Sequence, residues 1–197
     1  MQIDPTFRAY VDHLDLNALT QSEDVVYVVD EQMNLKAYNP AWETFALNNN
    51  GASVLEKYPL GKSITAAFPE KIRTHYVNGY SQALKTGDRF DQDYECSSPN
   101  QYRLFHQIAY PLPAGRGLVI TNHLVVTGEI NRMKYAFGPK YRNADGFVVQ
   151  CCHCRTVKNQ ADPERWDWVP SLVEHPDIKT LHSVCANCLD QYFPDLI

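Results

Sequence analysis

Residues Val25–Trp42 read VVYVVDEQMNLKAYNPAW. The β-prone run Val25–Val29 predicts a buried strand, residues 30–34 a turn, and Leu35–Tyr38 the partner strand. Asn39 followed by Pro40 is typical of a helix start, because an Asn side chain caps the first turn and proline fits the first helical position. A strand pair followed at once by a capped helix is therefore the first structural prediction.

Further along the chain, a longer helix is predicted to follow Pro69 and to stop at Gly87, because the apolar residues Ile72, Tyr76, Tyr80 and Leu84 recur at every fourth position. Three strands are predicted after it from apolar alternation. The residues predicted to face the core are, strand by strand, Phe90, Tyr94 and Cys96 in the first, Tyr102, Leu104, Ile108 and Tyr110 in the second, and Leu118, Ile120, Leu124 and Val126 in the third. This order predicts an α+β fold: an antiparallel five-stranded sheet with helices on one face.

The bulk composition is that of an ordinary globular protein. The chain has 197 residues, 44% of them hydrophobic, and a net charge of −5. Because no long basic run appears, a nucleic-acid partner is not expected. The first residues lack a basic flank and an apolar run, and the longest aliphatic patches are far shorter than a membrane span. We expect a cytoplasmic protein without a membrane partner.

The strongest chemical signal is a pair of C-x-x-C motifs. Five of the six cysteines lie between residues 151 and 188, and two pairs of them have the spacing of metal ligands. Four thiolates are what a closed tetrahedral structural zinc site needs. The predicted ligands of one structural zinc per chain are Cys151, Cys154, Cys185 and Cys188.

Other uses of these cysteines stay open at this stage. A zinc ion that is released on oxidation, an iron–sulfur cluster and a metal-free cluster are the alternatives. A catalytic zinc normally keeps an open position with three protein ligands, which four well-spaced thiols do not favour. The sequence also has no Gly-rich phosphate loop and no H-E-x-x-H motif. We therefore do not expect an enzyme, and a redox-active or enzymatic cysteine cluster is the alternative.

Two polar residues fall in register with the apolar positions of the last two predicted strands. His106 and Asn122 are placed by alternation on the core-facing side. A polar group aimed at a core needs a hydrogen-bond partner there. The two side chains either satisfy each other or a backbone group, or they line a small pocket. The predicted lining of that pocket is His106, Asn122, Gln92, Tyr94 and Phe90.

The order of elements, with Val28-Val29-Asp30 before Asn39-Pro40-Ala41-Trp42, resembles the PAS sensor fold over roughly residues 20–128. The segment Cys96-Ser97-Ser98-Pro99 before a strand with Arg103 is similar to a subgroup of stand-alone bacterial PAS proteins, which usually have Asp where Ser97 stands. The tail is similar to a Cys-rich extension found after some bacterial PAS domains. In arrangement, a strand-borne cysteine pair and a helix-opening pair resemble treble-clef zinc sites.

The resemblance implies a sensory, signalling or protein-interaction module without an output domain of its own. It also implies a homodimer that acts on a downstream signalling protein which the sequence does not identify. A PAS-shaped scaffold whose interior is filled by its own aromatic side chains is a further alternative. The predicted segments are an N-terminal flanking helix (1–22), a PAS-like domain (23–128), a linker (129–145) and a zinc module (146–197).

Overall fold

The computed structural model describes residues 1–175 and 178–196. Residues 176, 177 and 197 of the predicted zinc module lie outside the described residues. The chain forms two compact units. The first comprises Met1–Phe68, Arg73–Gln92 and His106–His123, and the second comprises Pro69–Ile72, Asp93–Phe105 and Leu124–Ile197. The segment boundaries predicted from the sequence stay predictions.

The part of the chain that the structure describes is an α+β fold with two sheets. Its α-helices are α1 (Leu16–Gln21), α2 (Pro40–Asn48), α3 (Ala52–Lys57), α4 (Glu70–Thr86), α5 (Ser171–Glu174) and α6 (Ala186–Tyr192). Its strands are β1 (Gln2–Ile3), β2 (Val25–Asp30), β3 (Leu35–Tyr38), β4 (Phe90–Glu95), β5 (Gln101–Pro111), β6 (Gly117–Glu129), β7 (Val148–Cys151), β8 (Val157–Asn159), β9 (Asp162–Asp167) and β10 (Thr180–Ser183).

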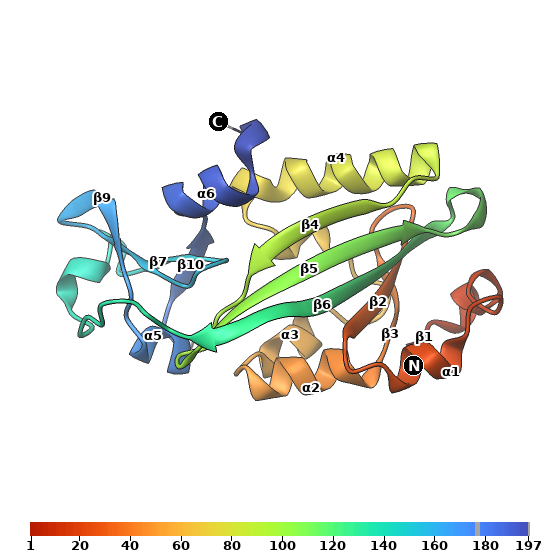
Figure 1. Ribbon diagram of the computed structural model, residues 1–197, viewed down its shortest axis with the longest axis horizontal. Helices are drawn as coiled ribbons and strands as arrows, with labels where there is room; N and C mark the ends of the chain where they lie inside the picture. The colour runs from red at the N-terminus through yellow and green to blue at the C-terminus, as the bar shows by residue number, and fades with distance from the viewer. Residues whose placement is uncertain (176–177, 197) are drawn as a thin grey trace. The chain divides into compact units, whose positions relative to one another are not determined.

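The larger sheet is antiparallel and has the order β1-β3-β2-β6-β5-β4, with β4, β5 and β6 side by side in Figure 1. It has six strands in place of the predicted five, because Gln2 and Ile3 pair with Tyr38 and Ala37 of β3. Residues 1–22, expected to form a flanking helix, thus hold this short strand, a 3-10 helix at Pro5–Tyr10 and α1. The five predicted strands are all present.

The predicted strand pair and capped helix are confirmed. Asn39 is fully buried and caps α2 by accepting a hydrogen bond from the backbone N–H of Trp42. The same oxygen accepts from the N–H of Val26, at 3.0 Å. Its amide nitrogen donates to the carbonyls of Leu19, Ser22 and Asp24. One side chain therefore fixes where β2 begins and where α2 begins.

Alternation along β2 separates two packing faces. Tyr27 contacts the ring of Trp42 in α2, with centroids 5.0 Å apart, and is hydrogen-bonded to Tyr80 of α4. Both helices therefore lie on the face to which Tyr27 points. The neighbouring residues Val26 and Val28 point the other way, into a core with the 3-10 helix. That core consists of Phe7, Val11, Val26, Val28, Ala37, Leu112 and Val119. Helical segments thus cover both faces of the sheet and not one.

In β5 the predicted phase of the core-facing residues is wrong. The buried residues are Phe105, Gln107 and Ala109, together with Ile108, whereas the side chain of His106 is 31% exposed. Apolar residues lie on both faces of this strand, so the alternation of apolar residues does not show which face is buried.

The phase predicted for β6 holds only for the first half of that strand. Leu118, Ile120 and Asn122 are buried, but Leu124 and Val126 are 48% and 47% exposed. The pairing of β6 with β2 ends at the pair Val25–Asn122, which precedes these exposed residues. The strand therefore continues beyond the region in which β2 accompanies it.

The second unit has its own sheet, with the order β10-β7-β8-β9 and β10 parallel to β7. Its apolar core consists of Tyr141, Val148, Val157, Val169 and Leu172. Tyr141 donates a 2.8 Å hydrogen bond to the buried carboxylate of Asp167, which also accepts from Arg165. Across residues 1–175 and 178–196, none of the helices combines the length and the apolar character that crossing a bilayer requires.

Candidate metal centre

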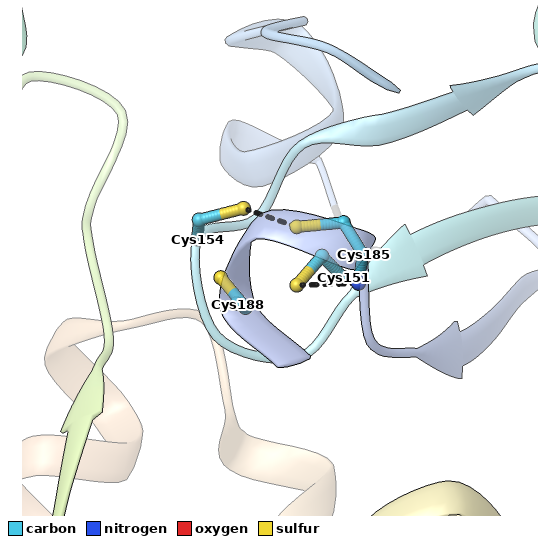
Figure 2. A group of neighbouring side chains, drawn as sticks. All are labelled: Cys151, Cys154, Cys185 and Cys188. Atoms are coloured by element: carbon cyan, nitrogen blue, oxygen red, sulfur yellow. Dashed lines mark hydrogen bonds between the residues drawn. The ribbon is translucent and has the colours of Figure 1, made fainter. Parts of the chain in front are cut away.

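The four predicted cysteine ligands come from two separate local structures of the second unit. Cys151 ends β7, and Cys154 lies in the turn that leads to β8. Cys185 is the N-cap residue of α6, and Cys188 lies in the first turn of that helix. A turn and a helix start each let residues i and i+3 point the same way. Figure 2 shows the four sulfur atoms converging from these two structures.

The geometry suits a tetrahedral metal ion. The four Sγ atoms lie within 4.8 Å of one another, and all four residues are buried. Cys154 Sγ and Cys185 Sγ are 3.6 Å apart. For Zn–S bonds of about 2.3 Å, the sulfur atoms of a tetrahedron are about 3.8 Å apart. All six cysteines are free thiols in this structure, so the four sulfurs are not joined as disulfides. The four cysteines can therefore hold a metal ion.

Hydrogen bonds within and around the cluster distribute the protons unevenly. Hydrogen bonding with Cys151 lowers the pKa of Cys154 to about 7, and it also lowers the pKa of Cys185. The backbone N–H of Cys185 donates to Cys151 Sγ, at 3.5 Å. The hydroxyl of Thr156 lies 2.9 Å from Cys154 Sγ. Hydrogen bonding within the cluster raises the pKa of Cys151 and Cys188 in turn, so two of the four thiols favour the thiolate form, which binds a metal, and two do not.

The two residues between the first pair of cysteines, Cys152 and His153, do not belong to the cluster. His153 is buried, and its ring lies 5.1 Å from the ring of Phe193 and 5.3 Å from that of Tyr192. Burial raises the pKa of the Cys152 thiol to about 12, which disfavours its thiolate form. His182 lies exposed on β10.

Arg132, which belongs to the predicted linker 129–145, lies against the cluster. Arg132 donates from Nη1 to the Cys154 carbonyl and from Nη2 to both carboxylate oxygens of Glu95, all at 2.8 Å. The two side chains are 26% and 5% exposed. Glu95 precedes Cys96-Ser97, a segment noted only for its resemblance to PAS proteins. Neither residue belongs to a motif, so their pairing left no signal in the sequence.

A cleft of about 250 Å³ opens beside the cysteines. Three of the four ligands, Cys154, Cys185 and Cys188, contribute to its wall. The other lining residues are mostly polar: Glu95, Arg132, Thr156, Glu164, Trp166, Ala186, Asn187 and Gln191. The cleft therefore borders three of the four buried cysteines.

Four of the five residues predicted to line a PAS-type pocket lie in the first unit. Asn122 is buried; its oxygen accepts from Gln107, and its amide donates to the Val25 carbonyl. This outcome matches the expectation that Asn122 satisfies a neighbouring group. Gln92 is hydrogen-bonded to His75 at 2.6 Å, and His106 lies 4.0 Å from Asp91.

Phe90 packs into an aromatic cluster of the same unit. Its ring lies 5.4 Å from that of Tyr80, and a Cβ on Gly79 would come within 2.3 Å of it. Tyr94 belongs to the second unit, where its ring stacks on that of Phe105 at 5.5 Å. The role of these five residues in binding a ligand stays a prediction.

No protein-family model matches the sequence, and no curated protein matches it. Among solved structures, PAS domains are similar to the chain over 55–57% of its length. The PAS domain of a protein from Colwellia psychrerythraea shares 12% identity at a TM-score of 0.43, covering 56% of this chain and 92% of that one. The PAS domain of nitrogen regulation protein NR(II) from Vibrio parahaemolyticus shares 13% identity at a TM-score of 0.38, and the match covers 57% of this chain and 98% of that one.

Phage VqmA, in a complex with DPO, is similar at 13% identity and a TM-score of 0.42. The match covers 59% of this chain, which spans only about half (53%) of the VqmA chain. The likeness of all three structures concerns the fold, and no ligand or partner is carried over from them. PAS domains are thus structural neighbours of the chain, and the four-cysteine cluster belongs to its C-terminal part.

Proposed function

We propose that the protein is a cytoplasmic sensory or protein-interaction module in which a PAS-like domain is joined to one structural zinc site. The convergence of Cys151, Cys154, Cys185 and Cys188 carries the metal part of this proposal. Four thiolates this close together in a buried site repel one another unless a metal ion neutralises them. Zinc fits best, because all-sulfur tetrahedral sites of this spacing are typical of structural zinc.

The arrangement supports a treble-clef-like site. The first cysteine pair lies at the turn between β7 and β8, and the second opens α6. The partial positive charge at a helix start favours the thiolate form of Cys185 and Cys188. A site with four protein ligands leaves no open position for substrate, which supports a structural and not a catalytic metal.

The packing of the first unit favours an interaction module over a receptor for a large ligand. Tyr80 donates to Gln107 at 2.6 Å, and Gln107 donates to Asn122 at 3.0 Å. These buried polar groups are satisfied by one another, and the ring of Phe90 fills the space above Gly79. A change in the packing of this unit, caused by a partner or a homodimer mate, would then be the signal.

One observation favours a second function, a redox-responsive metal centre. Cys154, Cys185 and Cys188 line the cleft beside the cluster, which brings a small oxidant in that cleft close to three of the four ligands. Oxidation of two thiolates to a disulfide by a peroxide, which is reduced to water, would release the metal.

Elemental analysis combined with thiol titration separates the two functions. A structural site predicts one zinc per chain and four thiols that react only after denaturation. A redox-responsive site predicts that zinc is released by stoichiometric peroxide without denaturant, together with loss of two titratable thiols. Protein without bound metal, purified under reducing conditions without chelator, would refute both.

A further inference from the structure

Arg132 connects the metal centre to a turn that has no metal ligand. From the carbonyl of Cys154, its guanidinium reaches the carboxylate of Glu95, and it lies 5.3 Å from the ring of Trp168. A bidentate guanidinium–carboxylate pair fixes both the distance and the plane of the two groups. The position of the Arg132 side chain is therefore fixed by the Cys154 carbonyl at one end and by the Glu95 carboxylate at the other.

The connection continues from Glu95 into residues 96–103. The hydroxyl of Ser97 donates to Glu95 Oε1. Ser97 Oγ in turn accepts from the backbone N–H of Arg103 at 3.3 Å, and Arg103 Nε donates to the Cys96 carbonyl at 2.8 Å. The nearly buried carboxylate of Glu95 is thus bonded to the guanidinium of Arg132 and to the hydroxyl of Ser97. The turn that these bonds hold is the Cys96-Ser97-Ser98-Pro99 segment that the metal site itself does not use.

Charge gives Arg132 a second role. A divalent ion with four thiolate ligands carries a net charge of −2, and such a charge is unfavourable in a buried site without a counter-ion. A guanidinium does not lose its proton in a protein, and Arg132 is held next to Cys154 by the hydrogen bond to its carbonyl. The cluster therefore has a fixed positive charge beside it.

We propose that Arg132 is a positioning residue of the metal centre, which stabilises the metal-bound thiolates by its charge and anchors the 96–103 turn to them through Glu95. This inference rests on the proposed metal site and extends it to residues outside the cysteine motifs. It assigns a role to Arg132, Glu95 and Ser97, the last of which stands where the similar PAS proteins usually have Asp.

The first test is zinc affinity, measured on the full chain by competition with a chromogenic chelator. Loss of a group that supports a metal ligand typically weakens metal binding about 10- to 100-fold. We expect that loss for Arg132→Met, which keeps much of the side-chain volume but no charge. Arg132→Lys keeps the charge but not the planar two-point contact with Glu95, so it should lose less affinity than Arg132→Met. The matched control is Arg142→Met, because Arg142 is exposed and bonds the Gly146 carbonyl.

The second test is hydrogen exchange of residues 96–103 at saturating zinc, where every variant is metal-loaded. Arg132→Met and Glu95→Gln should both raise the exchange rate of the Cys96 and Arg103 amides, whereas Arg142→Met should not.

Equal losses of zinc affinity in the Met and Lys variants, or no loss in either, would overturn the charge role. Unchanged exchange in the turn would overturn the anchoring role. Wild-type protein that binds no zinc would overturn the proposed metal site itself. That result differs from the failure of the charge role and from the failure of the anchoring role.

Discussion

The two compact units bury polar groups in different ways. In the first unit, Asn39 and Gln107 are buried and find their hydrogen-bond partners among nearby backbone groups and side chains. In the second unit, four buried thiols lie within 4.8 Å of one another. A satisfied polar network can form from the chain alone, whereas a thiol cluster of this kind gains its stability from a bound ion. We therefore expect removal of a metal to affect the second unit and not the first.

The largest effect is expected from Cys154→Ser, because removing one of four ligands disrupts the site that holds the second unit. Binding of structural zinc contributes about 10–16 kcal/mol in small zinc domains. We expect zinc to be lost on dialysis and the near-ultraviolet circular dichroism of Trp166 and Trp168 to collapse. Cys96→Ser, which changes a thiol outside the cluster, should retain one zinc. A zinc-loaded Cys154→Ser protein with native spectra would show that the cluster is not the metal site.

In the first unit, Asn39→Ala should have the next largest effect. The variant removes the cap of α2 and leaves the buried N–H of Val26 without its side-chain acceptor. The expected loss is about 3 kcal/mol of unfolding free energy, since a lost cap and a lost buried acceptor each cost roughly 1–2 kcal/mol. Urea denaturation measures it, with the exposed Asn48→Ala as control. Equal midpoints for the two variants would mean that Asn39 does not organise this unit.

Gly79→Ala examines whether the interior beside α4 is filled. A Cβ there would lie 2.3 Å from the ring of Phe90, so the ring must move or the helix must shift. Overpacking of a filled core costs about 1–3 kcal/mol, against a gain of about 1 kcal/mol from replacing glycine in a helix. We expect a net loss of about 1 kcal/mol in urea denaturation. A stabilised variant would reveal free space beside Phe90, as a ligand cavity would provide.

The smallest expected effect is the pH dependence contributed by Asp167. Burial raises the pKa of this carboxyl, but hydrogen bonds from Arg165 and Tyr141 outweigh burial and hold it below the ordinary value of 3.8. A lowered folded-state pKa adds stability above about pH 4, which is lost as the pH falls through the folded-state pKa. Asp167→Asn should flatten this acid-side slope in thermal melts of the second unit. An unchanged slope would exclude Asp167 as its source.

The sequence predicted the first half of the fold well, because its signals are local. Leu35–Tyr38 is a strand with the predicted bounds, and Asn39 and Pro40 start α2 as capping chemistry requires. The phase of β5 was wrong, because Phe105 and Ala109 compete with Leu104 and Ile108 in an alternating pattern. The strand β1 has only two residues and forms through a long-range pairing with β3, which no local pattern shows.

The sequence predicted the four cysteine ligands, because the spacing of C-x-x-C pairs is diagnostic, but not the residues around them. Two C-x-x-C pairs gave the four clustered cysteines, since each pair lies on a turn or a helix start whose geometry is local. The Arg132–Glu95 pair joins residues 37 positions apart with no motif around either. Its geometry depends on how β4 and the segment after β6 fold back, so the sequence placed Arg132 only within a predicted linker.

Hydrogen exchange before and after chelation of bound metal tests the contrast between the units most directly. On removal of the metal, we predict that the amides of Val148–Cys151 and Ala186–Tyr192 lose their protection. The amides of Val25–Asp30 should keep theirs, and readdition of zinc should restore the second unit. Unchanged protection throughout the second unit after complete metal removal would contradict the account, as would loss of protection in both units together.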